Sequence, residues 1–64
     1  MPYVKIELLK GRTREQKAAV AEAVTTALVT LAASRPEDVH VVFTDVEKSD
    51  WAIAGRLLDQ GKTS

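Results

Sequence analysis

Pro2, directly after the initiator methionine, is the residue whose position most suggests chemistry. Two interpretations are open. Proline lacks an N–H for a sheet ladder and is tolerated where a strand begins, so Pro2 could simply open a strand. Alternatively, removal of Met1 makes Pro2 the N-terminus and leaves a free secondary amine that can carry chemistry.

The remaining composition excludes the common catalytic residue sets. The chain has no cysteine and one histidine, which excludes disulfides, thiolate nucleophiles and a zinc site built from such ligands. A glycine-rich phosphate loop is also absent. Serine catalysis would need His40 as the base beside Ser34 or Ser49, and their spacing does not support it. The residues left to carry chemistry are Pro2, Arg12, His40 and Trp51.

The elements that must position these residues follow from the hydrophobic pattern. Residues 2–9 alternate between apolar and polar, which predicts a strand half-buried on one face. Residues 39–46, "VHVVFTDV", are β-branched and aromatic and predict a second strand. Residues 51–58 are short and apolar and contain Gly55, so we expect a hairpin or loop that packs against a neighbouring chain. Residues 59–64 are expected to be a frayed tail.

A long helix is predicted between the strands, from Thr13 to Ser34. Thr13 and Gln16 have the spacing of a capping box, and Glu15 suits the positive end of the helix dipole. Pro36 ends the helix. The helical spacing predicts a packed stripe of Val20, Val24, Ala27, Leu28 and Leu31. The opposite face is rich in alanine and threonine, which suggests contacts with other subunits; it comprises Glu15, Ala19, Glu22, Thr26 and Thr30.

The fold class is therefore α/β, with one domain over residues 1–64. A helix of about 20 residues spans about 30 Å, and a strand of eight spans roughly 26 Å, so the helix can return the chain for a second, parallel strand. A two-stranded sheet with one helix is too small to be stable alone. Since disulfides and metals are excluded, we expect self-association.

Charge and hydropathy exclude several partners. Nine basic residues balance nine acidic ones, so nothing steers the chain to nucleic acid or an anionic membrane surface. No apolar run reaches the ~18 residues of a membrane span, and no signal-peptide pattern opens the chain. The lack of cysteine fits a cytoplasmic protein.

Three features together resemble the 4-oxalocrotonate tautomerase family: Pro2, "LLKGRTREQK" at residues 8–17, and "DWAIAGRLL" at residues 50–58. The resemblance covers nearly the whole chain. It implies a βαβ subunit with a short C-terminal hairpin, assembled as a homohexamer. It also implies an isomerase that needs no cofactor and acts on a small enol or 2-oxo acid.

The resemblance implies a role for each candidate residue. Pro2 would take a proton from the hydroxyl of a dienol and return one to carbon, giving the conjugated ketone. A free α-amino group has a pKa of about 7.7–8.0, and an apolar pocket lowers it toward neutral pH, where a base is most useful. Arg12, from another subunit, would bind the substrate carboxylate. Leu9, Trp51 and Ile53 would line the pocket.

Two positions depart from the family pattern. His40 stands where well-known members carry a second arginine, and histidine does not form a forked pair with a carboxylate. "AIAG" at residues 52–55 replaces a more typical "GIGG". We therefore expect a monocarboxylate or an aryl pyruvate enol as substrate. His40 either donates a hydrogen bond to the developing enolate or is simply a strand residue.

Two other interpretations remain open at this point. One is a hydratase-type dehalogenase or decarboxylase of the same superfamily, which needs an additional acid such as Glu7 or Asp38. The other is a catalytically silent, self-assembling module, which would follow if Met1 were retained.

Overall fold

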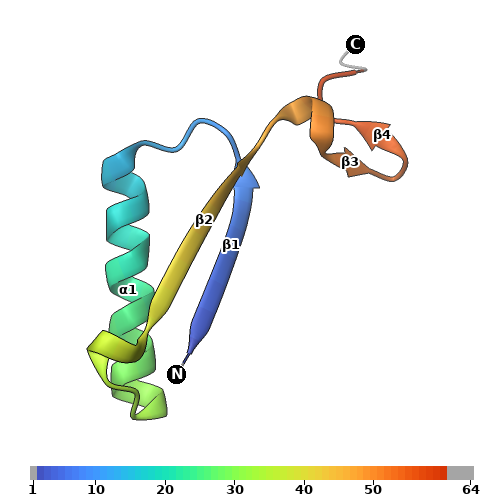
Figure 1. Ribbon diagram of the computed structural model, residues 1–64. Helices are drawn as coiled ribbons and strands as arrows, with labels where there is room; N and C mark the ends of the chain where they lie inside the picture. Colours follow the sequence, from blue (N-terminus) through green and yellow to red (C-terminus); the bar gives the residue numbers. More distant parts are fainter. Residues whose placement is uncertain (1, 61–64) are drawn as a thin grey trace.

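The computed structural model of the chain describes residues 2–60 and contains a β-α-β unit followed by a small hairpin (Figure 1). The elements, in chain order, are β1 (Tyr3–Leu9), α1 (Arg14–Ala32), the 3-10 turn η1 (Pro36–Asp38), β2 (His40–Val46), the 3-10 turn η2 (Lys48–Asp50), β3 (Ala52–Ile53) and β4 (Arg56–Leu57). The predicted order of strand, long helix, strand and hairpin is confirmed. No helix within these residues is long and apolar enough to cross a membrane.

The strands β1 and β2 form a parallel pair whose register runs from Tyr3 opposite His40 to Leu9 opposite Val46. The helix α1 runs alongside this pair (Figure 1). Alternate strand residues are half-buried, as the period of two predicts. The half-buried side chains that share this alternation are Val4, Ile6, Leu8, Val41 and Phe43.

The helix begins and ends with well-defined caps. Thr13 Oγ1 accepts a hydrogen bond from the Gln16 N–H at 3.0 Å, and Gln16 Oε1 accepts one from the Thr13 N–H at 2.8 Å. This is the predicted capping box, with Glu15 in the first turn. At the other end, Ala33 adopts the left-handed conformation with φ 58° and ψ 28°, and its N–H donates to the Leu28 carbonyl.

Glycine at position 33 should stabilise the protein. A residue with a Cβ pays about 1 kcal/mol to adopt the left-handed conformation, which glycine adopts freely. We expect Ala33→Gly to raise the free energy of unfolding by about 1 kcal/mol, measured by thermal or denaturant unfolding. The matched control, Ala23→Gly in the exposed middle of α1, should lower it by about the same amount. Equal destabilisation by both variants would contradict the cap assignment.

The helix face that packs on the sheet differs from the predicted stripe. Val24 and Leu28 are half-buried as predicted, but Ala27 is exposed, Val20 is 42% exposed and Leu31 is 84% exposed. The half-buried positions of the helix are Lys17, Ala21, Val24, Thr25, Leu28 and Val29. The prediction was wrong at Val20, Ala27 and Leu31 because apolar residues lie around most of this helix. Several faces therefore satisfy a helical spacing, and only contact with the sheet selects one.

The hairpin lies beyond the end of the parallel strands (Figure 1). The strands β3 and β4 are antiparallel and joined by Ala54 and Gly55, with φ values of 54° and 82°. Two successive positive φ values are typical of tight hairpin turns. Gln60, which belongs to the predicted tail, is held to the hairpin, because its side chain accepts a hydrogen bond from the Leu57 N–H at 2.9 Å. Residues 61–64 of that tail lie outside the described residues.

One copy of the chain does not enclose a core. None of residues 2–60 is fully buried. The radius of gyration is 15.4 Å, whereas a compact domain of this length has about 11 Å. The molecule measures 47 × 23 × 15 Å. Large apolar side chains such as Tyr3, at 62% exposure, remain in contact with water.

Candidate functional site

Pro2 and His40 lie together at the end of the sheet where both parallel strands begin. Pro2 immediately precedes β1 and is half-buried. Its carbonyl oxygen accepts a hydrogen bond from the His40 N–H at 3.0 Å. His40 is the first residue of β2 and has an exposed side chain. The parallel register therefore makes His40 a direct neighbour of Pro2.

The other candidate residues lie near the opposite end of the sheet. Leu9 is the last residue of β1 and is half-buried, and Arg12 follows in the connection to α1 with an exposed side chain. Trp51 follows η2, is half-buried, and borders a shallow depression together with Glu7 and Val46. The Trp51 carbonyl accepts a hydrogen bond from the Leu58 N–H at 2.9 Å, which fixes it at the base of the hairpin.

Ile53 belongs to the hairpin itself and is 62% exposed. It pairs with Arg56 across the tight turn. Its large apolar side chain therefore has little cover within its own chain.

The length of β1 separates the two groups of candidate residues. The strand has seven residues, and at about 3.3 Å per residue it spans roughly 20 Å. The N-terminus and the hairpin accordingly lie at opposite ends of the sheet (Figure 1). One copy thus brings Pro2 to His40, and Leu9 to the end that carries Arg12 and Trp51, but it does not bring the two groups together.

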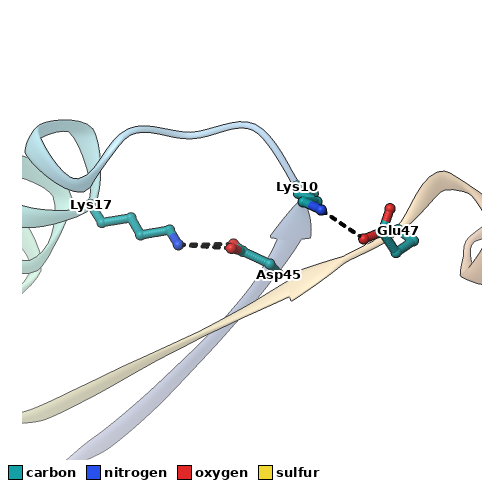
Figure 2. A network of polar contacts seen from close by, with 4 residues as sticks. All are labelled: Lys10, Lys17, Asp45 and Glu47. Atoms are coloured by element: carbon teal, nitrogen blue, oxygen red, sulfur yellow. Dashed lines mark hydrogen bonds and ion pairs between the residues drawn. The ribbon is translucent and has the colours of Figure 1, made fainter.

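Arg12 lines a groove between the helix and the sheet. The side chains that share this groove are Leu8, Arg12, Gln16, Lys17, Ala19, Val20 and Phe43. Within residues 2–60, Arg12 makes no ion pair. The other cation of the groove, Lys17, is paired: its Nζ lies 2.9 Å from Asp45 Oδ1 (Figure 2). Arg12 is therefore the groove's uncompensated positive charge among the described residues.

Lys17 and Asp45 were not recognised from the sequence, although a signal was present. Asp45 continues the alternation of Val41 and Phe43, so it falls on the helix-facing side of β2. A carboxylate on an otherwise apolar face needs a cationic partner. Lys17, in the first turns of the predicted helix, was a candidate for that partner.

The described residues do not form a metal-binding cluster. No three histidine, cysteine, aspartate or glutamate side chains gather anywhere between residues 2 and 60. Among residues 2–60, this geometry offers a proline at one end of the strand. Near the other end it offers a guanidinium without an ion pair and an aromatic side chain, which border separate depressions.

A family model described as "tautomerase enzyme" matches residues 2–60. The chain belongs to the tautomerase family. Within the superfamily, its relatives and structural neighbours indicate the 4-oxalocrotonate tautomerase family, which confirms the resemblance found in the sequence. It is therefore an enzyme of the isomerase class.

Two curated relatives show how closely this tautomerase follows known members. It is 47% identical over 55 residues to a 2-hydroxymuconate tautomerase of Comamonas testosteroni, covering 86% of this chain and 87% of the relative. It is 41% identical over 61 residues to a probable tautomerase of Halalkalibacterium halodurans, covering 94% and 100%.

Solved structures agree with the fold. YwhB, a homologue of 4-oxalocrotonate tautomerase, superimposes with a TM-score of 0.88 at 36% identity and covers 92% of this chain and 97% of its own. A 4-oxalocrotonate tautomerase described as a heterohexamer, from Chloroflexus aurantiacus, has a TM-score of 0.89 at 26% identity and covers 97% and 100%. The β-α-β subunit with its C-terminal hairpin is thus the fold of this family.

Proposed function

We propose that this tautomerase converts 2-hydroxydienoates or related enols to conjugated ketones without a cofactor. Removal of Met1 frees the secondary amine of Pro2, which acts as the general base. The amine takes the proton of the substrate's 2-hydroxyl group, electrons move along the conjugated system, and the same proton carrier returns a proton to carbon. The relative named 2-hydroxymuconate tautomerase supports this substrate class.

Arg12 is the group that binds the substrate carboxylate. A guanidinium is always charged and can donate two parallel hydrogen bonds to a carboxylate. Its exposure and lack of an ion pair among the described residues leave it available for an anion. Once the carboxylate is bound there, the guanidinium partly neutralises its charge and draws electron density toward that end of the conjugated system, which stabilises the enolate-like transition state.

Leu9, Trp51 and Ile53 form the apolar wall of the pocket. An apolar surrounding disfavours the protonated amine and keeps Pro2 available as a base near neutral pH. Trp51 lies close to the end of the sheet where Leu9 ends β1, and the exposed Ile53 extends this apolar surface along the hairpin.

The observation that carries the proposal is the distribution of these residues over both ends of one sheet. Seven strand residues separate Pro2 from Arg12 and Trp51. A pocket that contains Pro2 together with Arg12 and Trp51 must therefore draw residues from more than one copy. Arg12 and Trp51 border separate depressions of the chain, so they need not come from the same copy. The absence of any fully buried residue among 2–60 gives a second reason for self-association, because a free copy leaves its apolar faces in water. We infer a homohexamer.

His40 sets the class of acid that the pocket accepts. Its backbone N–H donates to the Pro2 carbonyl, so His40 adjoins Pro2 in the sheet, and its exposed imidazole is available to the pocket that we assign to the proposed base. A neutral imidazole can hydrogen-bond an enolate oxygen but does not replace a second guanidinium. The favoured substrates are therefore monocarboxylates such as aryl pyruvate enols.

The proposed function is tested by measuring ketonisation of an enol panel that includes 2-hydroxymuconate and phenylenolpyruvate. Intact-mass spectrometry of the same sample establishes that its chain begins at Pro2. We expect turnover of both acids, with a higher kcat/KM for phenylenolpyruvate. Absence of turnover in protein with a free Pro2 would refute the proposal.

Arginine at position 40 should change this preference. His40→Arg adds a charged fork beside Pro2, and a charge-assisted hydrogen bond to a second carboxylate is worth roughly tenfold in binding. We expect the ratio of kcat/KM for 2-hydroxymuconate over phenylenolpyruvate to rise about tenfold. His40→Gln, which adds no charge, is the control and should leave the ratio within about twofold. An unchanged ratio in both variants would show that position 40 does not face the substrate.

A further inference from the structure

The connection that carries Arg12, residues 10–13, is attached to β2 on both sides (Figure 2). At its start, the Lys10 N–H donates to the Val46 carbonyl at 2.9 Å, and Lys10 Nζ donates to Glu47 Oε2 at 3.0 Å. Just beyond its end, Lys17 Nζ lies 2.9 Å from Asp45 Oδ1 and donates to Asp45 Oδ2 at 3.0 Å.

These two ion pairs differ in their exposure to water. The side chains of Lys10 and Glu47 are 65% and 57% exposed, whereas those of Lys17 and Asp45 are 27% and 41% exposed. Water and salt weaken a charge pair more strongly the more it is exposed. The Lys17–Asp45 pair is therefore the stronger of the two side-chain links, and it joins the beginning of α1 to β2. Its loss should loosen the connection that precedes the helix more than any other segment.

The same pair decides which cation of the groove is available. Arg12 and Lys17 both line the groove between α1 and the sheet. Asp45 contacts Lys17 through both carboxylate oxygens, so its charge compensates Lys17 rather than Arg12. An incoming carboxylate would meet one uncompensated cation there instead of two.

We propose that the Lys17–Asp45 ion pair is a positioning device for Arg12. It holds the beginning of α1 against β2, which fixes the orientation of residues 10–13, and it keeps Lys17 from competing for the substrate carboxylate. This inference rests on the proposed role of Arg12 in carboxylate binding. Lys17 and Asp45 act through Arg12 and do not touch the substrate.

The test compares an acid with its neutral ester. Phenylenolpyruvate and its methyl ester share the reacting enol, but only the acid offers a carboxylate to Arg12. For Lys17→Met and for Asp45→Asn, we expect KM for the acid to rise by about threefold to fivefold, the range available to an ion pair of this exposure. The kcat for the acid should fall as well, because Arg12 is proposed to stabilise the transition state, whereas kcat/KM for the ester should stay within about twofold of the parent enzyme. Lys48→Met, which removes an exposed lysine that has no ion pair within residues 2–60, should leave the kinetic parameters of both substrates unchanged.

A double-variant cycle sharpens this test. In the Arg12→Ala background, Lys17→Met should no longer affect KM for the acid, because positioning an absent side chain has no consequence. If Lys17→Met and Asp45→Asn lower kcat/KM equally for the acid and the ester, the pair has a merely structural role and the proposal is overturned. A lower KM for the acid in Asp45→Asn, together with a higher one in Lys17→Met, would make Lys17 itself the carboxylate ligand and would also overturn it.

Failure of the underlying function gives a different pattern. If the parent enzyme does not prefer the acid to the ester, carboxylate binding by Arg12 is wrong. If the parent prefers the acid and Lys17→Met and Asp45→Asn keep that preference unchanged, the carboxylate-binding role of Arg12 stands. Only the positioning role of the ion pair is then wrong.

Discussion

Replacing Pro2 with alanine is expected to lower kcat/KM for enol ketonisation by about two to four orders of magnitude, the usual contribution of a positioned general base. Alanine also allows removal of Met1, so the variant still presents a free amine. That amine is primary, and no ring restricts its orientation toward the substrate. The measurement is the rate of absorbance change with phenylenolpyruvate, on protein whose first residue has been established by intact mass.

The chain offers a matched control for this variant, because it contains one other proline, Pro36. Pro36 begins η1 and is exposed, so Pro36→Ala should leave kcat/KM within about twofold of the parent. Full activity in Pro2→Ala with a verified N-terminus would exclude Pro2 as the base. It would leave the family assignment intact and require another proton carrier.

Removing the Arg12 side chain should have the second largest effect on kcat/KM. A charge-assisted hydrogen bond from a guanidinium to a carboxylate contributes roughly 10-fold to 100-fold, and we expect Arg12→Ala to lower kcat/KM for the acid by this factor. Because Arg12 is proposed to polarise the transition state as well as to bind the carboxylate, KM should rise and kcat should fall. Steady-state kinetics resolve the two parameters, and a circular dichroism melt establishes that the variant remains folded.

Arg14→Ala is the control for Arg12→Ala, since it removes the same charge two residues further along. Arg14 is the first residue of α1 and is exposed, so its loss should change kcat/KM by less than about twofold. Arg12→Lys should fall between alanine and the parent, because an ammonium keeps the charge but loses the planar fork. Equal losses in the Arg12→Ala and Arg14→Ala variants would indicate a general charge effect instead of a specific contact.

Much of the fold could be predicted from the sequence because local patterns determine it. The alternation in residues 2–9 and the capping box at Thr13 each rest on a few neighbouring residues, and both are found in the structure. The parallel pairing followed from comparing the lengths of helix and strand. The face of α1 was less predictable, because alanine and threonine fill its exposed side and several stripes look equally apolar.

The candidate site was harder to predict than the fold. The sequence singles out Pro2, Arg12 and Trp51 as candidates, and the predicted strand at residues 2–9 already separates Pro2 from Arg12. The parallel register, which places the end of β2 and hence Trp51 near the Arg12 end of β1, comes from the structure. The same register brings His40 beside Pro2, a contact between residues far apart in the chain. The Lys17–Asp45 pair was missed because each partner, taken alone, resembles an ordinary surface charge.

The separation of Pro2 from Arg12 along one strand has a consequence for mixtures of chains. If every pocket takes Pro2 from one subunit and Arg12 from another, a chain defective at one end still offers an intact opposite end to its neighbour. Two inactive variants, one altered at each end, could then restore some complete pockets when they are assembled together. Conversely, one chain defective at both ends would disable its neighbours' pockets as well as its own. A gene for such a doubly defective chain, expressed beside the normal gene, would therefore lower the enzyme's activity by more than the mutant's share of the subunits.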